Sequence, residues 1–135
     1  MIELSKEKPY EDACKILGLR PVANYKSYKL TDETRNFIKL ETVAKALNEG
    51  WKPTTIDPKE VRYYVWGWNY TDNRKPSSLL TVSSRNGLGA AYAAVGTSLE
   101  FKDGDTAKEF ARMCKPMIVK YLFGRDDHEN FKFDF

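Results

Sequence analysis

The sequence predicts an α+β fold, in which two N-terminal helices and one C-terminal helix pack on a small three-stranded antiparallel sheet. Apolar residues recur at helical spacing toward both ends of the chain, between residues that favour helix starts and helix ends. The middle of the chain holds short alternating stretches separated by polar turns. Three neighbouring strands favour an antiparallel meander, and a sheet this small needs helices on one face for stability.

The first two helices are predicted over about residues 9–17 and 31–50. Pro9 suits a first helical position, and Gly18 is a typical helix stop. Gly50 is the expected end of the second helix, after an apolar stripe that recurs every three or four residues. Both helices should therefore bury one face against the sheet or against each other.

The third helix is predicted to open at the capping box Thr106-Ala107-Lys108-Glu109 and to end at Gly124. Pro116 lies inside this stretch, and a proline within a helix removes a hydrogen bond and bends the axis. We therefore expect a kinked helix about four turns long.

The first strand, about residues 60–70, is the most aromatic part of the chain, and two more strands are predicted at about 78–84 and 97–102. Alternate side chains of a strand share a face, so the strand has one aromatic row and one row of Val61, Tyr63 and Val65. The aromatic row is Tyr64, Trp66, Trp68 and Tyr70. Because it is the larger apolar surface, we expect it to face the core, and a binding platform is the alternative.

Residues 1–123 are predicted to form a single domain, followed by an acidic, aromatic tail at 124–135 that looks disordered. The whole chain of 135 residues carries a net charge of +3, and the tail holds two basic and four acidic residues. The tail is therefore −2 and the body +5, which permits binding to a polyanion without requiring it.

Cys14 and Cys114 are the only cysteines, and both fall on predicted helices. Their separation fits no metal-binding pattern, so we expect buried, reduced thiols. We identify neither a signal peptide nor an apolar run long enough to span a bilayer. These features predict a cytoplasmic protein without membrane association.

Five stretches together carry a family resemblance: Tyr10-Glu11-Asp12-Ala13-Cys14-Lys15-Ile16-Leu17-Gly18-Leu19, Ala46-Leu47-Asn48-Glu49-Gly50-Trp51-Lys52-Pro53, Tyr63-Tyr64-Val65-Trp66, Leu99-Glu100-Phe101-Lys102 and Ala107…Phe110-Ala111. Over most of residues 9–123 the chain resembles a family of small uncharacterised proteins encoded by phages and prophages of the Bacteroidetes. That family has no established activity. The resemblance implies a phage or prophage origin and action inside a bacterial host cell, and it implies no site residues.

The sequence shows no catalytic, cofactor or metal signature, so we predict a non-enzymatic protein without a cofactor. His128 is the only histidine, which excludes histidine-based triads and HExxH sites. The loop Gly87-Leu88-Gly89 lacks the Lys-Ser/Thr that a phosphate-binding loop requires. Two close acids in a desolvating pocket would be needed to favour an enzyme.

Aromatic strands beside cations are typical of proteins that stack single-stranded bases, so single-stranded nucleic acid is the first predicted ligand. Cations near the aromatic row would hold phosphates, and the row would stack on bases. The candidate residues are Arg62, Tyr64, Trp66, Trp68, Tyr70, Arg74, Lys75 and Arg85.

In two alternative interpretations the protein still acts by binding, but its ligand contacts a different surface or is of a different kind. A helix-turn-helix would place a recognition helix at about residues 21–30, with Asn24, Lys26, Ser27 and Lys29 facing DNA. A protein–protein interaction module, which includes self-association, would use the sheet face or the tail. The tail is similar to those of bacterial and phage single-stranded DNA-binding proteins, which dock partner proteins, although its Phe side chains could equally pack on the body.

Overall fold

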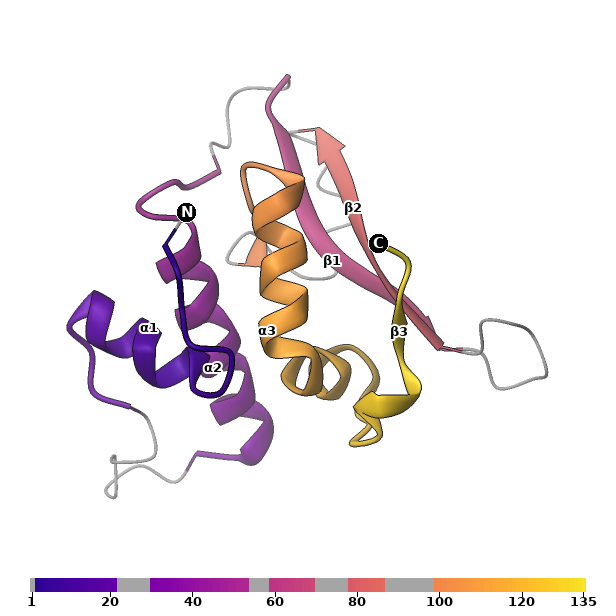
Figure 1. Cartoon of the computed structure of the whole chain (residues 1–135), viewed down its shortest axis with the longest axis horizontal. Coiled ribbons are helices and arrows are strands. Elements are labelled where there is room, and N and C mark those ends of the chain that lie inside the picture. Colours follow the sequence, from indigo (N-terminus) through magenta and orange to yellow (C-terminus); the bar gives the residue numbers. More distant parts are fainter. Residues whose placement is uncertain (1, 22–29, 54–58, 70–77, 87–98) are drawn as a thin grey trace.

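The helices lie in layers on one face of a small sheet in the computed structural model, which describes residues 2–21, 30–53, 59–69, 78–86 and 99–135 (Figure 1). Helix α3 packs directly on the strands, α2 packs on α3, and α1 packs on α2. The elements are α1 (Pro9–Leu17), α2 (Asp32–Leu47), β1 (Val61–Asn69), β2 (Ser78–Asn86), α3 (Gly104–Phe123), the short 3-10 helix η4 (His128–Asn130) and β3 (Lys132–Phe133). The predicted α+β class, with two N-terminal helices and one C-terminal helix, is confirmed.

The sheet is mixed, so the prediction of a purely antiparallel sheet is wrong. Strands β1 and β2 pair antiparallel along their whole length, and β3 pairs with β2 in parallel through Leu79–Lys132 and Leu80–Phe133. The third strand of the described sheet therefore comes from the C-terminal segment. In the described part of the strand predicted at 97–102, Phe101 forms an isolated antiparallel bridge with Tyr63, and the chain turns into α3 two residues later.

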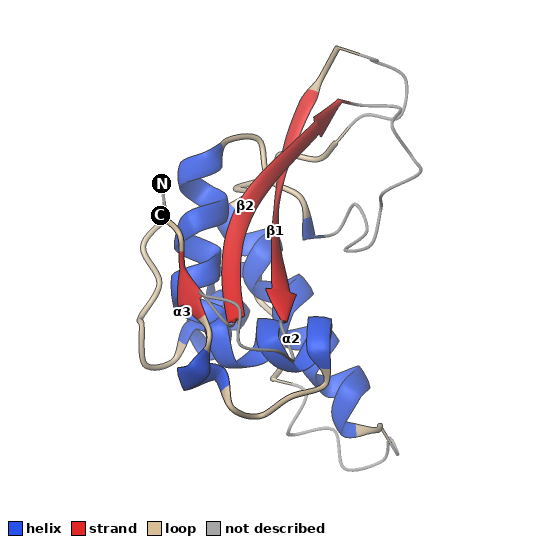
Figure 2. Cartoon of the chain, turned by 90° about the vertical axis from the view of Figure 1, so that its right-hand side faces the viewer, coloured by secondary structure: helices blue, strands red, loops and turns tan. Residues whose placement is uncertain are grey.

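Residues 124–135 fold onto the body, so the expectation that they are disordered is also wrong. Phe131 is fully buried, and its ring stacks on Phe123 of α3 at a centroid distance of 5.0 Å. Arg125 lies over the Phe131 ring and binds Asp127 through its guanidinium, which lowers the pKa of that carboxyl. These contacts turn the chain back toward the sheet, where β3 joins β2 (Figure 2).

The helix limits follow local signals closely, with two shifts. Gly18 caps α1 with a left-handed backbone at φ 68°, as predicted, whereas α2 ends at Leu47, before Gly50. Helix α3 begins earlier than its predicted capping box, because the Asp103 side chain accepts a hydrogen bond from the Thr106 amide at 2.7 Å. The kink expected from Pro116 is present, with non-helical torsions at Cys114.

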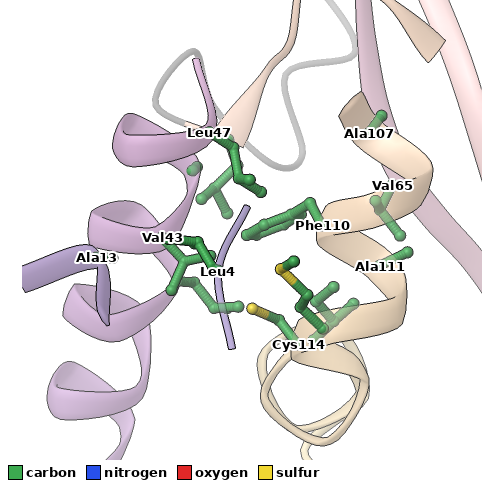
Figure 3. Packing of buried hydrophobic residues seen from close by; sticks show 14 of the residues in the cluster. Leu4, Ala13, Val43, Leu47, Val65, Ala107, Phe110, Ala111 and Cys114 are labelled. Atoms are coloured by element: carbon green, nitrogen blue, oxygen red, sulfur yellow. The ribbon is translucent and has the colours of Figure 1, made fainter. Parts of the chain in front are cut away.

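The core is centred on α3, whose buried side chains meet α2 on one side and the strands on the other (Figure 3). Phe110 and Cys114 of α3 belong to the same buried cluster as Val43 of α2 and Val65 of β1. Cys14 and Cys114 are free and buried, as predicted. Burial raises the pKa of the Cys114 thiol to about 12, so this thiol stays protonated and structural.

Candidate binding surface on the sheet

One face of the β1–β2 pair packs on α3, and it carries Tyr63, Val65 and Gly67 of β1. Val65 is in the core, and its antiparallel partner Val82 packs against the core from β2. At Gly67 there is no room for a side chain, because a Cβ atom there would lie 2.5 Å from the Leu79 carbonyl oxygen and 3.1 Å from the Phe123 ring. A side chain at position 67 would therefore collide with β2 and with α3.

The opposite face carries the aromatic row, which therefore does not face α3; the expectation of a core position holds in part, because Tyr64 and Trp66 are partly buried and pack against the core cluster. Opposed residues in an antiparallel pair share a face. We call this surface the aromatic face, and it consists of Tyr64, Trp66 and Trp68 of β1 with Leu79, Thr81 and Ser83 of β2. Tyr64 and Trp66 are partly buried, whereas the Trp68 side chain is 43% exposed. Exposure is thus greatest at the end of the strand.

Lys132 joins this surface from the third strand. Its parallel partner is Leu79, which in turn faces Trp68 across the antiparallel pair. Trp68, Leu79 and Lys132 therefore form one row across all three strands, and Lys132 is exposed. Sequence reasoning missed Lys132 because it assigned the residue to a disordered tail. The alternation of Phe131, Phe133 and Phe135 with polar residues was the signal that this segment has one buried side.

The Arg62 side chain is buried and paired with two acidic side chains. Its side chain is only 3% exposed, and its Nε and Nη1 atoms lie 3.3 Å from Glu60 Oε1 and 3.6 Å from Glu100 Oε1. Glu100 is fully buried, and the Asn48 amide binds its backbone carbonyl at 3.0 Å. This placement argues against the phosphate contact predicted for Arg62, because a buried carboxylate already neutralises the guanidinium.

Several predicted site residues lie outside the described residues. Tyr70, Arg74 and Lys75 belong to the connection 70–77 between β1 and β2, and the helix-turn-helix candidates Asn24, Lys26, Ser27 and Lys29 belong to 22–29. Arg85 is opposite Arg62 in the β1–β2 ladder, and only its backbone is described. Of the eight predicted site residues, the structure therefore places three aromatic side chains on one face of the β1–β2 pair, and Arg62, which alternation puts on the same face, is buried against Glu60 and Glu100.

The described residues offer little to a catalytic reading. An apolar cleft of about 10 Å³ beside Phe110 has room for a single water molecule, which is too small for an organic substrate. His128 lies 3.6 Å from Glu129, and within the described part of the chain no three metal-ligating side chains converge. Among the described helices, none has both the length and the apolar character that crossing a bilayer requires.

Comparisons with protein-family models, with curated proteins and with solved structures found no match to this chain.

Proposed function

We propose that this protein is a non-enzymatic binding protein and that its ligand is single-stranded nucleic acid, held on the aromatic face. One observation carries the proposal: Trp68, which is 43% exposed, lies in the same cross-sheet row as the exposed cation Lys132. A base stacked on an exposed aromatic ring contributes about 1–3 kcal/mol, and a neighbouring lysine contributes attraction to the adjacent phosphate.

Charge supports the same ligand. The body of the chain is basic, and the connection that directly follows Trp68 in the sequence contains Arg74 and Lys75. Lys132 takes over the role that sequence reasoning assigned to Arg62, since it is exposed on the aromatic face and Arg62 is not. The resemblance to phage proteins further supports an accessory role in the cytoplasm of a bacterial host.

Trp68 is the residue whose removal should weaken binding most. We expect Trp68→Ala to reduce affinity for a fluorescein-labelled oligo-dT about 5- to 150-fold at low salt, which corresponds to loss of one stacked base. Trp68→Phe should retain most of the affinity because a ring remains. Anisotropy measures affinity, and intrinsic tryptophan fluorescence measures stacking, since wild-type emission should be quenched by the oligonucleotide and Trp68→Phe emission much less so.

Lys132 should act through charge alone. Lys132→Ala should make the plot of log K against log salt concentration shallower by about 0.7, the contribution of one phosphate on a single strand. Lys45→Ala is the matched control, because Lys45 is an equally exposed lysine on α2, away from the sheet. Oligonucleotide binding that is absent at low salt, or indifferent to Trp68, would contradict the proposed ligand.

A protein ligand is the second candidate, and the burial of Arg62 favours it. Trp68 is exposed beside Leu79, and Arg62 of the same strand is paired with the buried Glu100. Such an apolar surface also suits contact with another protein. Self-association is one form of this function. Light scattering after size exclusion would then show a dimer in the wild type and a monomer in Trp68→Ala, with no salt-sensitive oligonucleotide binding in either.

A further inference from the structure

Three cations lie along one side of α3, next to the C-terminal segment. Lys108, Arg112 and Lys115 are spaced four and three residues apart, so their side chains share one face of the helix. We call them the α3 cation row. Neither stacking on the aromatic face nor packing of the core uses them.

The row is held in place by two aromatic rings. Phe133 and Phe135 stack at a centroid distance of 4.9 Å. Arg112 and Lys108 lie 5.2 Å and 5.9 Å from the Phe135 ring centre, and Lys115 lies 5.3 Å from that of Phe133. A cation over a ring keeps its charge and still has donors directed away from the ring, so these contacts position the cations without neutralising them.

Few acids oppose this charge. The Arg112 side chain is 46% exposed, and its Nη1 atom forms a salt bridge with Glu109 Oε2 at 3.7 Å, a partly exposed pair that holds the guanidinium only weakly. Together with Lys132, the row brings four cations to this edge of the fold, and the acids nearest them in the sequence are Asp105, one turn before Lys108 on the same helix face, Glu109 and Asp134. The balance of these seven residues is +1, which favours an anionic ligand.

The row also connects to the aromatic face. Successive residues of a strand point to opposite faces, so Lys132 lies on the aromatic face while Phe133 lies beneath Lys115 on the helical side. In the described sheet β3 is the edge strand next to β2. A chain bound along Trp68, Leu79 and Lys132 reaches the α3 cation row as soon as it passes over β3.

We propose that the α3 cation row binds backbone phosphates of the single strand whose bases stack on the aromatic face. This inference rests on the proposed function and adds the path of the ligand: across the sheet, over β3 and along α3. The row supplies affinity without sequence preference, because phosphate contacts carry no base information.

The decisive measurement is the salt dependence of oligo-dT binding by Lys108→Gln/Arg112→Gln/Lys115→Gln. Loss of three phosphate contacts should reduce the slope of log K against log salt by about 2, at about 0.7 per contact. Quenching of tryptophan emission at saturation should be unchanged. The matched control, Lys6→Gln/Lys15→Gln/Lys45→Gln, removes the same charge from exposed positions elsewhere and should keep the wild-type slope. An equal decrease in both variants would overturn the row as a site.

Loss of the ring contacts could loosen the C-terminal segment, so the fold of the triple variant is checked by circular dichroism and thermal melting. If its transition is lost, Arg112→Gln alone carries the test, with an expected slope change of about 0.7. Lys108→Arg/Lys115→Arg should bind like the wild type, because charge and ring contact are both retained. A slope that Arg112→Gln leaves unchanged would also overturn the inference.

A ligand without bases separates this inference from the proposed function. Sodium tripolyphosphate should shift the backbone amide NMR signals of residues 108–115 in the wild type and not in the triple variant. If those shifts occur while Trp68→Ala binds oligo-dT normally, phosphate binding by the α3 cation row is supported and base stacking on Trp68 is contradicted. If Trp68→Ala weakens binding, tripolyphosphate shifts no signal of residues 108–115 and the triple variant keeps the wild-type salt slope, base stacking is supported and phosphate binding by the row is contradicted.

Discussion

The two faces of the β1–β2 pair differ in a way that residue size alone would not suggest. The face that packs on α3 carries Val65 and Gly67, whereas the other face carries the large rings of Tyr64, Trp66 and Trp68. Close approach of a helix to a strand needs small residues, so bulk on one side of a strand is a poor guide to the side that a helix covers. Large aromatic residues beside a small-residue face are thus compatible with a binding surface.

The largest difference between the faces should appear at two adjacent residues of β2. Leu80 is fully buried under α3, and Leu80→Ala should lower the free energy of unfolding by about 2–5 kcal/mol through lost burial and a new cavity. Leu79 lies on the aromatic face and is only partly buried. Leu79→Ala should therefore lower the free energy of unfolding by less than about 1 kcal/mol. Urea denaturation measures both, and similar losses would show that the aromatic face is as well packed as the core.

A smaller effect is expected where the core face leaves no room. Gly67→Ala would place a Cβ atom against the backbone oxygen of Leu79, and overpacking of this kind lowers stability by about 1–3 kcal/mol. Gly104→Ala is the matched control, because a Cβ there meets Tyr63 at an ordinary 3.7 Å. Thermal melting of the two variants compares them directly. Equal melting temperatures would mean that β1 can shift relative to both β2 and α3 and so accommodate the added methyl group.

The smallest effect is expected at the cap that starts α3 on the helical side. Asp103→Ala should cost about 1 kcal/mol, whereas Asp103→Asn should cost little because its amide oxygen can also cap. Acceptance of the Thr106 backbone amide lowers the pKa of Asp103. Its contribution is therefore present above the ordinary carboxyl pKa and is lost as the pH falls through the lowered value.

Urea midpoints at about pH 7 and about pH 3 test this titration. Asp103→Asn should lose less stability on acidification than the wild type, since the amide does not titrate. A wild-type loss that Asp103→Asn reproduces in full would assign the acid sensitivity to other carboxyls.

Helices could be predicted because their signals are local. Gly18 marks the end of α1, and Pro116 marks the kink of α3 through contacts within a few residues. The β1–β2 pair was likewise visible as two alternating stretches with a polar turn between them. The third strand was not, because β3 is two residues long and its pairing with β2 spans the whole of α3.

The orientation of the aromatic row could not be read from alternation, which defines two faces without saying which one a helix covers. Gly67 was the informative residue, because a missing side chain in a strand often marks a close approach of another element. Burial of Arg62 was only half visible: Glu60 is two residues away, whereas Glu100 becomes a neighbour only through the Tyr63–Phe101 bridge. The α3 cation row could be found as a helical pattern, but its aromatic support required the folded C-terminal segment.

The parallel pairing of β3 with β2 would link binding of the proposed ligand to the integrity of the fold. Trp68 and Lys132 are distant in the sequence and enter the same cross-sheet row, on either side of Leu79, only when this short ladder forms. A ligand that contacts both residues binds the folded chain and not the unfolded one, so it stabilises the pairing of β3 with β2. At a free concentration one hundred times its dissociation constant, such a ligand raises the free energy of unfolding by about 2.7 kcal/mol.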